Sequence, residues 1–166
     1  MNEWAVVKFR DILSEKDISS IIKLVQQTAV FNEEELAVAE ELLRESLEKG
    51  EQSYYKCLLA EQNGSIAGYA CYATILGTNG SFELYWLVVE KESQRTGLGA
   101  QIMKEFENKV RQAGGKRIFV GTSSQEDYLP ARAMYESWGY NKTAVLEDFY
   151  DNGVDLIYYA KSLPTS

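Results

Sequence analysis

The chain has 166 residues, of which 45% are hydrophobic. This is enough to bury a core within a single domain of residues 1–166, and it is inconsistent with a disordered protein. The formal net charge of -8 argues against broad nucleic-acid binding, which needs Lys and Arg to neutralise phosphates. The chain has no histidine and only two cysteines, which excludes zinc sites of the Cys/His type and Ser-His or Cys-His catalysis, and we expect no bound metal.

The start of the chain, Met1-Asn2-Glu3-Trp4, lacks the basic segment and apolar stretch of a secretory signal. No apolar run approaches the ~20 residues that are needed to span a bilayer. We therefore expect a cytoplasmic protein with no membrane partner.

Two helices are predicted after a short strand at Val6–Arg10. Ser14 is followed three residues later by Asp17, which is the spacing of a capping box, and Asn32 precedes three glutamates that suit the positive end of a helix dipole. Hydrophobic residues at helical spacing follow both starts. Gly50 is typical of the end of the second helix.

Three antiparallel strands are predicted next, at Tyr54–Glu61, Ile66–Thr74 and Phe82–Val89. Asn63-Gly64 and Asn79-Gly80, which separate these strands, are dipeptides typical of tight turns. A two-residue loop at Asn63-Gly64 would set Cys57 opposite Ala70 and Cys71 opposite Lys56. The two cysteines would then point to opposite faces of the sheet, so we expect no disulfide between them.

The C-terminal half alternates helices and strands. A helix is predicted after the turn at Gln94–Gly99, and the following strand, Lys116–Gly121, should run parallel to Phe82–Val89 because a helix connects the two. Another helix begins near Pro130. A last hairpin is predicted from Thr143–Phe149 and Val154–Ala160.

The order β-α-α-β-β-β-α-β-α-β-β predicts an α/β fold of the α+β type. We expect a mixed sheet of six to seven strands with helices on both faces.

The turn after Phe82–Val89 has the features of a pyrophosphate site. It reads Gln94-Arg95-Thr96-Gly97-Leu98-Gly99-Ala100 and leads into a helix, whose first N–H groups are free and carry partial positive charge. The two glycines let a phosphate approach the backbone, and Arg95 adds a positive charge. A Walker loop would need Gly-Lys-Ser/Thr at the end of this turn, which the sequence lacks. A dinucleotide-binding fingerprint would need Gly or Ala at position 102, which is Ile102. The sequence therefore matches neither motif.

The remaining candidate for this turn is the motif Q/R-x-x-G-x-G/A, which Gln94, Gly97 and Gly99 match. On this motif and its position the chain resembles the GNAT superfamily of N-acetyltransferases. A second block, from Ala131 through Tyr135 to Tyr140, is also similar to the family. The resemblance covers roughly residues 66–161.

The sequence departs from the family pattern in two places. Many members carry Asn seven positions before the matching tyrosine, where this chain has Tyr128. The stretch Glu147-Asp148-Phe149-Tyr150 resembles a prokaryotic subgroup, and this leaves the acceptor open.

The resemblance implies an acetyl-CoA-dependent enzyme that acetylates a primary amine by direct attack in a ternary complex. The pantetheine arm of acetyl-CoA would bond to the backbone of Leu87, Val88 and Val89, between two strands that splay apart. The pyrophosphate would lie on the N–H groups of the turn, with the segment from Gln94 to Ala100 as the cofactor-binding residues.

Two residues are catalytic candidates. Glu83 lies eleven residues before Gln94, a spacing shared with the catalytic glutamate of the histone-acetylating branch of the family. A carboxylate on an apolar strand is costly to bury, and burial would raise its pKa towards that of a useful base. The alternative is a solvated glutamate at a strand end. Tyr135 matches the tyrosine that the family places near the cofactor sulfur as an acid, and its alternative is a core aromatic residue.

Tyr85 and Tyr128 are weaker candidates for lining the acceptor site, because an ordinary position on the cleft wall or the surface explains both better. A non-catalytic acyl-CoA sensor, a protein or peptide N-acetyltransferase and transfer of a longer acyl group remain alternatives. The acceptor is a small-molecule or peptide amine of unknown identity, and a homodimer is compatible with the sequence.

Overall fold

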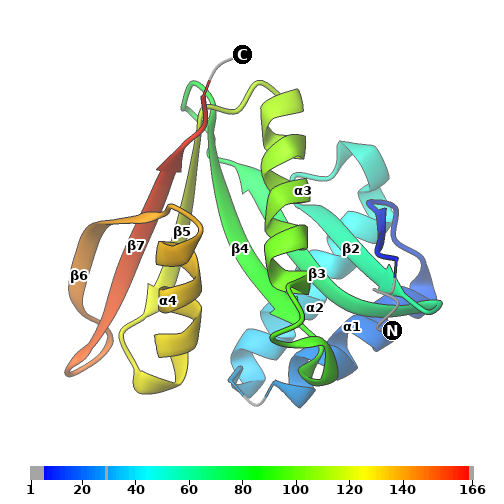
Figure 1. The fold of residues 1–166 in the computed structure, drawn as a ribbon, viewed down its shortest axis with the longest axis horizontal. Helices are drawn as coiled ribbons and strands as arrows, with labels where there is room; N and C mark the ends of the chain where they lie inside the picture. Colours follow the sequence, from blue (N-terminus) through cyan, green and yellow to red (C-terminus); the bar gives the residue numbers. More distant parts are fainter. Residues whose placement is uncertain (1–5, 29, 165–166) are drawn as a thin grey trace. The chain divides into compact units, whose positions relative to one another are not determined.

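Figure 1 shows the fold in a computed structural model, which describes residues 6–28 and 30–164. Seven strands form one mixed sheet in the order β1-β2-β3-β4-β5-β7-β6, and this confirms the predicted fold class. Met1–Trp4, on which the expectation about a secretory signal rests, lie outside the described residues. None of the helices in the described ranges combines the length and the hydrophobicity that a membrane span requires.

The elements follow the predicted order. The helices are α1 (Glu15–Gln27), α2 (Glu33–Lys49), α3 (Leu98–Gln112) and α4 (Leu129–Ser137). The strands are β1 (Lys8–Arg10), β2 (Lys56–Gln62), β3 (Ser65–Thr74), β4 (Ser81–Val89), β5 (Arg117–Ser123), β6 (Asn141–Asp151) and β7 (Val154–Ser162). Three short 3-10 turns are η1 (Gly50–Gln52), η2 (Lys91–Ser93) and η3 (Glu126–Tyr128).

Contacts divide the chain into two compact units, and each is described by itself. Unit one comprises the residues up to Ala73 together with Trp86–Phe106, and unit two comprises Thr74–Tyr85 together with the residues from Glu107 onwards. The boundary passes through β4 and through α3, so both elements contribute to both units.

Unit one carries helices on both faces of its strands (Figure 1). The core beneath α1 and α2 includes four side chains with at most 1% exposure: Ile21, Leu43, Leu59 and Cys71. On the other face, the ring of Tyr72 lies against Phe106 of α3, with centroids 4.9 Å apart. Because Cys71 and Tyr72 are neighbours on β3, their side chains point to opposite faces, and the prediction of a two-sided arrangement is confirmed.

The predicted helix starts are also confirmed. The Asp17 carboxylate accepts hydrogen bonds from the Ser14 backbone N–H at 2.6 Å and from the Ser14 hydroxyl at 2.8 Å. At α2, Asn32 and Glu35 exchange reciprocal bonds of 2.8 Å. These bonds satisfy N–H groups that would otherwise lack partners at the helix ends. Gly50 follows α2 with φ of 54°, a conformation that favours glycine.

The predicted register of β2 and β3 is wrong. Gln62 pairs with Ser65 across the expected two-residue turn, but the register shifts at a bulge between Ala60 and Glu61. Cys57 therefore lies directly opposite Cys71, and not opposite Ala70. Both thiols are free and buried, with 2% and 1% exposure. One extra residue in one strand turns every later side chain to the other face, and the turn sequence alone does not reveal it.

Unit two contains the parallel pair that was predicted. Ser81–Leu84 of β4 pair in parallel with Arg117–Val120 of β5, and β7 pairs antiparallel to β5. The packing of α3 in this unit includes a buried carboxylate: Glu107 accepts from Lys161 Nζ at 2.9 Å and from the Tyr140 hydroxyl at 3.1 Å. The outer strand β6 is exposed along its whole length.

Candidate active site

The turn between β4 and α3 is held by its own side chains. Gln94 Nε2 donates to the Val89 carbonyl at 3.2 Å, and the Thr96 hydroxyl donates to the Ser93 carbonyl at 2.5 Å. Both bonds tie the first half of the turn to the residues that precede it, within unit one. The predicted turn therefore exists as a defined structure that leads from β4 into α3.

Two residues of the turn have positive φ angles. Gly97 has φ of 87°, and a Cβ at this position would have no heavy atom within 4 Å. The glycine is thus required by the backbone conformation, and it leaves open space over the turn. Arg95 has φ of 64°, which is uncommon for a residue with a side chain, and it is exposed.

The start of α3 presents free donors. The first backbone bond of the helix joins the Gln101 N–H to the Gly97 carbonyl at 3.1 Å. The N–H groups of Leu98, Gly99 and Ala100 come before this bond, so they point out of the helix at its positive end. Donors, dipole and open space together form a site that suits a phosphate group.

β4, the strand before the turn, continues past the segment that pairs with β5. Pairing of β4 with β5 runs from Ser81 to Leu84, whereas the strand itself extends to Val89. Val88 is buried in the core of unit one, while Leu87 and Val89 are partly buried. These three residues are the ones whose backbone was predicted to meet the pantetheine arm.

Glu83 lies on the paired segment of β4, opposite Phe119 of β5. Its side chain is partly buried, and burial raises the pKa of its carboxyl group above the ordinary value. A hydrogen bond from the Tyr158 hydroxyl lowers the pKa of Glu83 in part. Glu83 is therefore not a fully solvated glutamate at a strand end, since it has a partner and is shielded from water.

Tyr135 is the buried residue of α4, with 8% exposure. Its ring lies against Trp138, Tyr140 and Tyr159, with centroid distances of 6.1, 6.1 and 6.2 Å. Burial raises the pKa of Tyr135 to about 12, so the hydroxyl is protonated at neutral pH and can donate a proton. The neighbouring Met134 is 43% exposed, so it is not part of this cluster.

Glu83 and Tyr135 lie on opposite faces of the unit two strands. Glu83 contacts Tyr158, and Tyr135 packs against Tyr159. Tyr158 and Tyr159 are consecutive residues of β7, and consecutive side chains of a strand point to opposite faces. The sequence did not reveal this division.

The two weaker candidates are both partly buried. Tyr85 lies two residues after Glu83 on β4, and Tyr128 ends η3 immediately before α4. The loop that carries Tyr128 is held by Arg132, which donates to the carbonyl groups of Ser123 at 2.5 Å and Gln125 at 2.9 Å. The sequence analysis did not predict this role of Arg132, because an arginine within a helix gives no sign that its side chain forms hydrogen bonds with the preceding loop.

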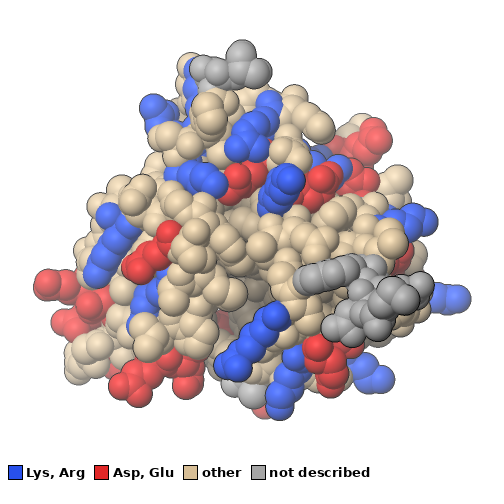
Figure 2. Space-filling view, in the orientation of Figure 1, with Lys and Arg blue, Asp and Glu red and all other residues tan. Residues whose placement is uncertain are grey.

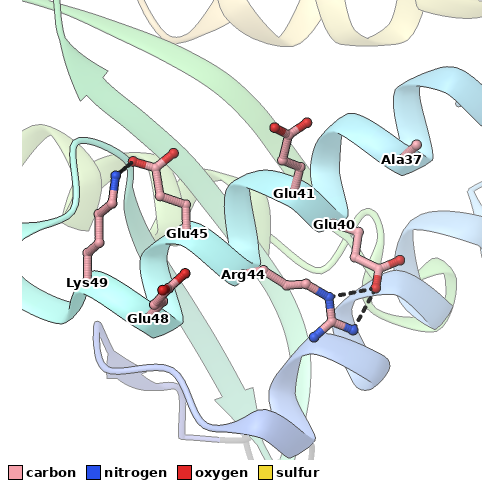
Figure 3. Close-up of a pocket in the computed structure, with 7 residues that line it drawn as sticks. All are labelled: Ala37, Glu40, Glu41, Arg44, Glu45, Glu48 and Lys49. Carbon is pink, nitrogen blue, oxygen red and sulfur yellow. Dashed lines mark hydrogen bonds and ion pairs between the residues drawn. The ribbon is translucent and has the colours of Figure 1, made fainter.

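Charged residues elsewhere do not form a comparable site. Lys and Arg alternate with Asp and Glu over the face in Figure 2. Figure 3 shows a shallow surface hollow on α2, where Arg44 pairs with Glu40 at 2.7 Å and Lys49 with Glu45 at 2.9 Å. These are solvated i,i+4 pairs of a helix surface. Within the described part of the chain, no group of three or more His, Cys, Asp and Glu side chains is arranged to hold a metal ion.

Comparisons with known proteins agree with this geometry. A family model described as an acetyltransferase (GNAT) domain matches residues 23–163. An uncharacterized N-acetyltransferase of Methanocaldococcus jannaschii is 30% identical over 148 residues, which are 82% of this chain and 91% of that protein.

Solved structures extend the comparison. An acetyltransferase from Desulfovibrio desulfuricans, assigned to the GNAT family, has 36% identity and a TM-score of 0.92, with 95% of this chain and 99% of that chain covered. An aminoglycoside 6'-N-acetyltransferase in complex with coenzyme A has 18% identity and a TM-score of 0.76, covering 96% and 98% of the two chains. At this lower identity the similarity extends to the fold alone.

Proposed function

Because the chain belongs to the GNAT superfamily of acetyltransferases, we propose that it moves the acetyl group of acetyl-CoA to a primary amine by direct attack in a ternary complex. The observation that carries the proposal is the turn from Gln94 to Ala100. It is fixed by side-chain bonds, contains a glycine at positive φ, and presents free N–H groups at the start of α3.

The turn would bind the pyrophosphate of acetyl-CoA through the backbone N–H groups from Arg95 to Ala100, with Arg95 adding a positive charge. The backbone of Leu87, Val88 and Val89 would bond to the pantetheine arm. Their strand continues beyond the pairing with β5, which supports this role. All of these residues belong to unit one, so one compact group of elements would hold the whole cofactor site.

Glu83 would act as the general base. A primary amine has an ordinary pKa of about 10.4 and is protonated near neutral pH, so it needs a proton acceptor before it can attack the thioester. A carboxylate whose pKa is raised by burial is a better acceptor than a solvated one. The amine nitrogen then forms a bond to the acyl carbon, and the carbon–sulfur bond breaks.

Tyr135 would protonate the departing thiolate. Its hydroxyl is protonated at neutral pH, and it approaches the strands from the face opposite to Glu83. The amine nitrogen and the sulfur are two different substituents of the acyl carbon in the tetrahedral intermediate, so the base and the acid act at different atoms. Separate positions for Glu83 and Tyr135 agree with these two roles.

Other carboxylates near the last hairpin are less suited to the role of base. The Asp148 carboxylate accepts the Gly153 N–H at 2.7 Å, and Asp148 itself has φ of 54°. Its side chain therefore stabilises the hairpin turn. Glu147 lies beside it on the exposed strand β6.

The test compares Glu83→Gln with Tyr135→Phe in steady-state assays with acetyl-CoA and a panel of amines. Glu83→Gln should lower kcat/KM by roughly 10²–10⁴-fold near neutral pH. Its activity should recover in part at high pH, where the amine loses its proton unaided. Tyr135→Phe should lower turnover with little recovery, and with acetyl-CoA affinity nearly unchanged because the ring remains.

A fully active Glu83→Gln variant near neutral pH would remove Glu83 from the mechanism. A wild-type protein that binds acetyl-CoA but releases no thiol with any amine would favour the non-catalytic acyl-CoA sensor. We keep the acceptor as a small-molecule or peptide amine, the domain as residues 1–166 and the cytoplasm as the compartment, and a homodimer is compatible with this function.

A further inference from the structure

Tyr158 of β7 reaches the Glu83 carboxylate of β4 across the intervening strand β5. Glu83 pairs with Phe119 of β5, and Gly121, two residues further along β5, pairs with Tyr158. Residues two apart on a strand share a face, so Glu83, Gly121 and Tyr158 all lie on one face of the unit two strands. Their hydroxyl and carboxylate groups are joined by a hydrogen bond.

Gly121 makes this reach possible. A Cβ at position 121 would lie 3.2 Å from Tyr158 Cε1 and 3.0 Å from Leu156 Cδ1, closer than ordinary van der Waals contact. The φ angle of Gly121 is not among the positive ones, so the backbone does not demand glycine here. A glycine inside a strand often marks a place where another group approaches closely, and here the approaching groups are the Leu156 side chain and the Tyr158 ring.

The direction of the hydrogen bond is settled by the state of both groups. Burial raises the pKa of Tyr158, and the negative charge of Glu83 raises it further, so the tyrosine keeps its proton and donates it. From β5, this face carries Phe119 and Gly121, which do not titrate, and the exposed Arg117, which lies two residues before Phe119. Tyr85 shares β4 with Glu83. Tyr158 is thus the group that sets the carboxylate orientation from β7.

We propose that Tyr158 is a positioning residue for Glu83, and that Gly121 provides the space through which it acts. The inference rests on the proposed role of Glu83 as base. A glutamate side chain has several rotatable bonds, and a donor fixed on a neighbouring strand restricts them. The bond leaves carboxylate lone pairs free to accept a proton from the amine, because each carboxylate oxygen has more than one acceptor site.

The experiment uses Tyr158→Phe, which keeps the ring and removes the hydroxyl, and Gly121→Ala, which keeps the hydroxyl and displaces the ring. Tyr159→Phe is the matched control, because its hydroxyl bonds to Glu136 at 3.1 Å on the opposite face. The pKa of Glu83 is measured by carbon-13 NMR of the side-chain carboxyl, with the signal assigned by its loss in Glu83→Gln. The pH profile of kcat/KM is measured on the same proteins.

Loss of the donor removes an interaction that favours the carboxylate, so the pKa of Glu83 should rise by on the order of 0.5–1 unit in Tyr158→Phe. The acid limb of kcat/KM should move to higher pH by the same amount. Gly121→Ala should shift both in the same direction, and Tyr159→Phe should shift neither.

Two different outcomes would contradict the role of Tyr158 and the role of Glu83, respectively. An unchanged Glu83 pKa in both Tyr158→Phe and Gly121→Ala would overturn the role of Tyr158, whatever happens to the rate. A raised pKa with an unmoved acid limb would show that Glu83 is not the base, and the proposed mechanism would fail with it.

Discussion

At the scale of single residues, the glycine turn is the feature on which we propose that acetyl-CoA binding depends. Gly97 combines a positive φ of 87° with open space where a side chain would project. A side chain there would occupy the position proposed for the pyrophosphate, and a negative one would also repel it. A substitution at Gly97 has two effects: it destabilises the fold through backbone strain and it weakens acetyl-CoA binding. The two can be separated by experiment, because other glycines have a positive φ but do not lie at the proposed binding site.

We predict that Gly97→Glu weakens acetyl-CoA binding ten-fold or more, which is about 1.4 kcal/mol, as measured by calorimetric titration. Gly77→Glu is the control, since Gly77 also has a positive φ, of 79°, and open space. Both variants should lose about 1–2 kcal/mol of stability from backbone strain. Equal acetyl-CoA affinities in the two variants would count against the turn as the pyrophosphate site.

At the scale of elements, the start of α1 is fixed by a charge network in unit one. Arg10 of β1 contacts Asp17 at 2.7 Å and Glu61 of β2 at 2.6 Å, and the same Asp17 carboxylate closes the capping box with Ser14. The hydrogen bond from Arg10 is the largest influence that lowers the pKa of Asp17, from 3.8 to about 2. One aspartate thus joins a helix start to two strands.

The depressed pKa of Asp17 predicts a pH window. The stabilisation is fully present above pH 4, where the carboxyl is ionised in folded and unfolded chains, and it is lost as pH falls through about 2. A shift of this size corresponds to about 2 kcal/mol for a group with 7% exposure. Asp17→Asn should therefore lower the free energy of unfolding by about 2 kcal/mol at pH 7.

Urea denaturation at pH 7 and at several values between 4 and 2 checks this prediction. The Asp17→Asn protein should lack the part of the acid sensitivity that the wild type shows in this range. Glu15→Gln is the control in the same helical turn, because Glu15 makes only an exposed contact with Arg44 at 3.4 Å. Its effect should stay within about 0.5 kcal/mol, and a comparable loss in both variants would contradict a special role of Asp17.

At the scale of the whole molecule, the boundary between the two units does not coincide with a linker. It cuts β4 after Tyr85 and α3 after Phe106, which are continuous elements. A strand or helix that loses half of its packing partners is marginal by itself. Neither unit therefore contains a complete set of elements, and this favours residues 1–166 as one cooperative domain.

We predict a single cooperative unfolding transition. The chain has three tryptophans, of which Trp86 belongs to unit one and Trp138 to unit two. Variants in which two of the three are replaced, so that only Trp86 or only Trp138 remains, therefore report on each unit separately. Their fluorescence transitions in urea should coincide with each other and with the loss of helical circular dichroism. Two separated midpoints would mean that the units unfold independently.

The sequence determined the features that depend on near neighbours along the chain. The caps at Ser14 and Asn32, the turn from Gln94 to Ala100 and the order of the elements follow from local spacing, and the structure confirms them. The family follows from the same turn, because its motif is contiguous. These features were accessible because a cap or a glycine turn acts within a few residues of its own position.

The tertiary structure alone decided which distant residues face one another. Cys57 lies opposite Cys71 because the register shifts between Ala60 and Glu61, where β3 has one extra residue, Ala67. Tyr158 meets Glu83 because β7, the last strand in the chain, inserts next to β5 and ahead of β6. A glycine in the middle of a strand signals a close approach, but the identity of the approaching group depends on strand order and register, which are set by packing over the whole sheet.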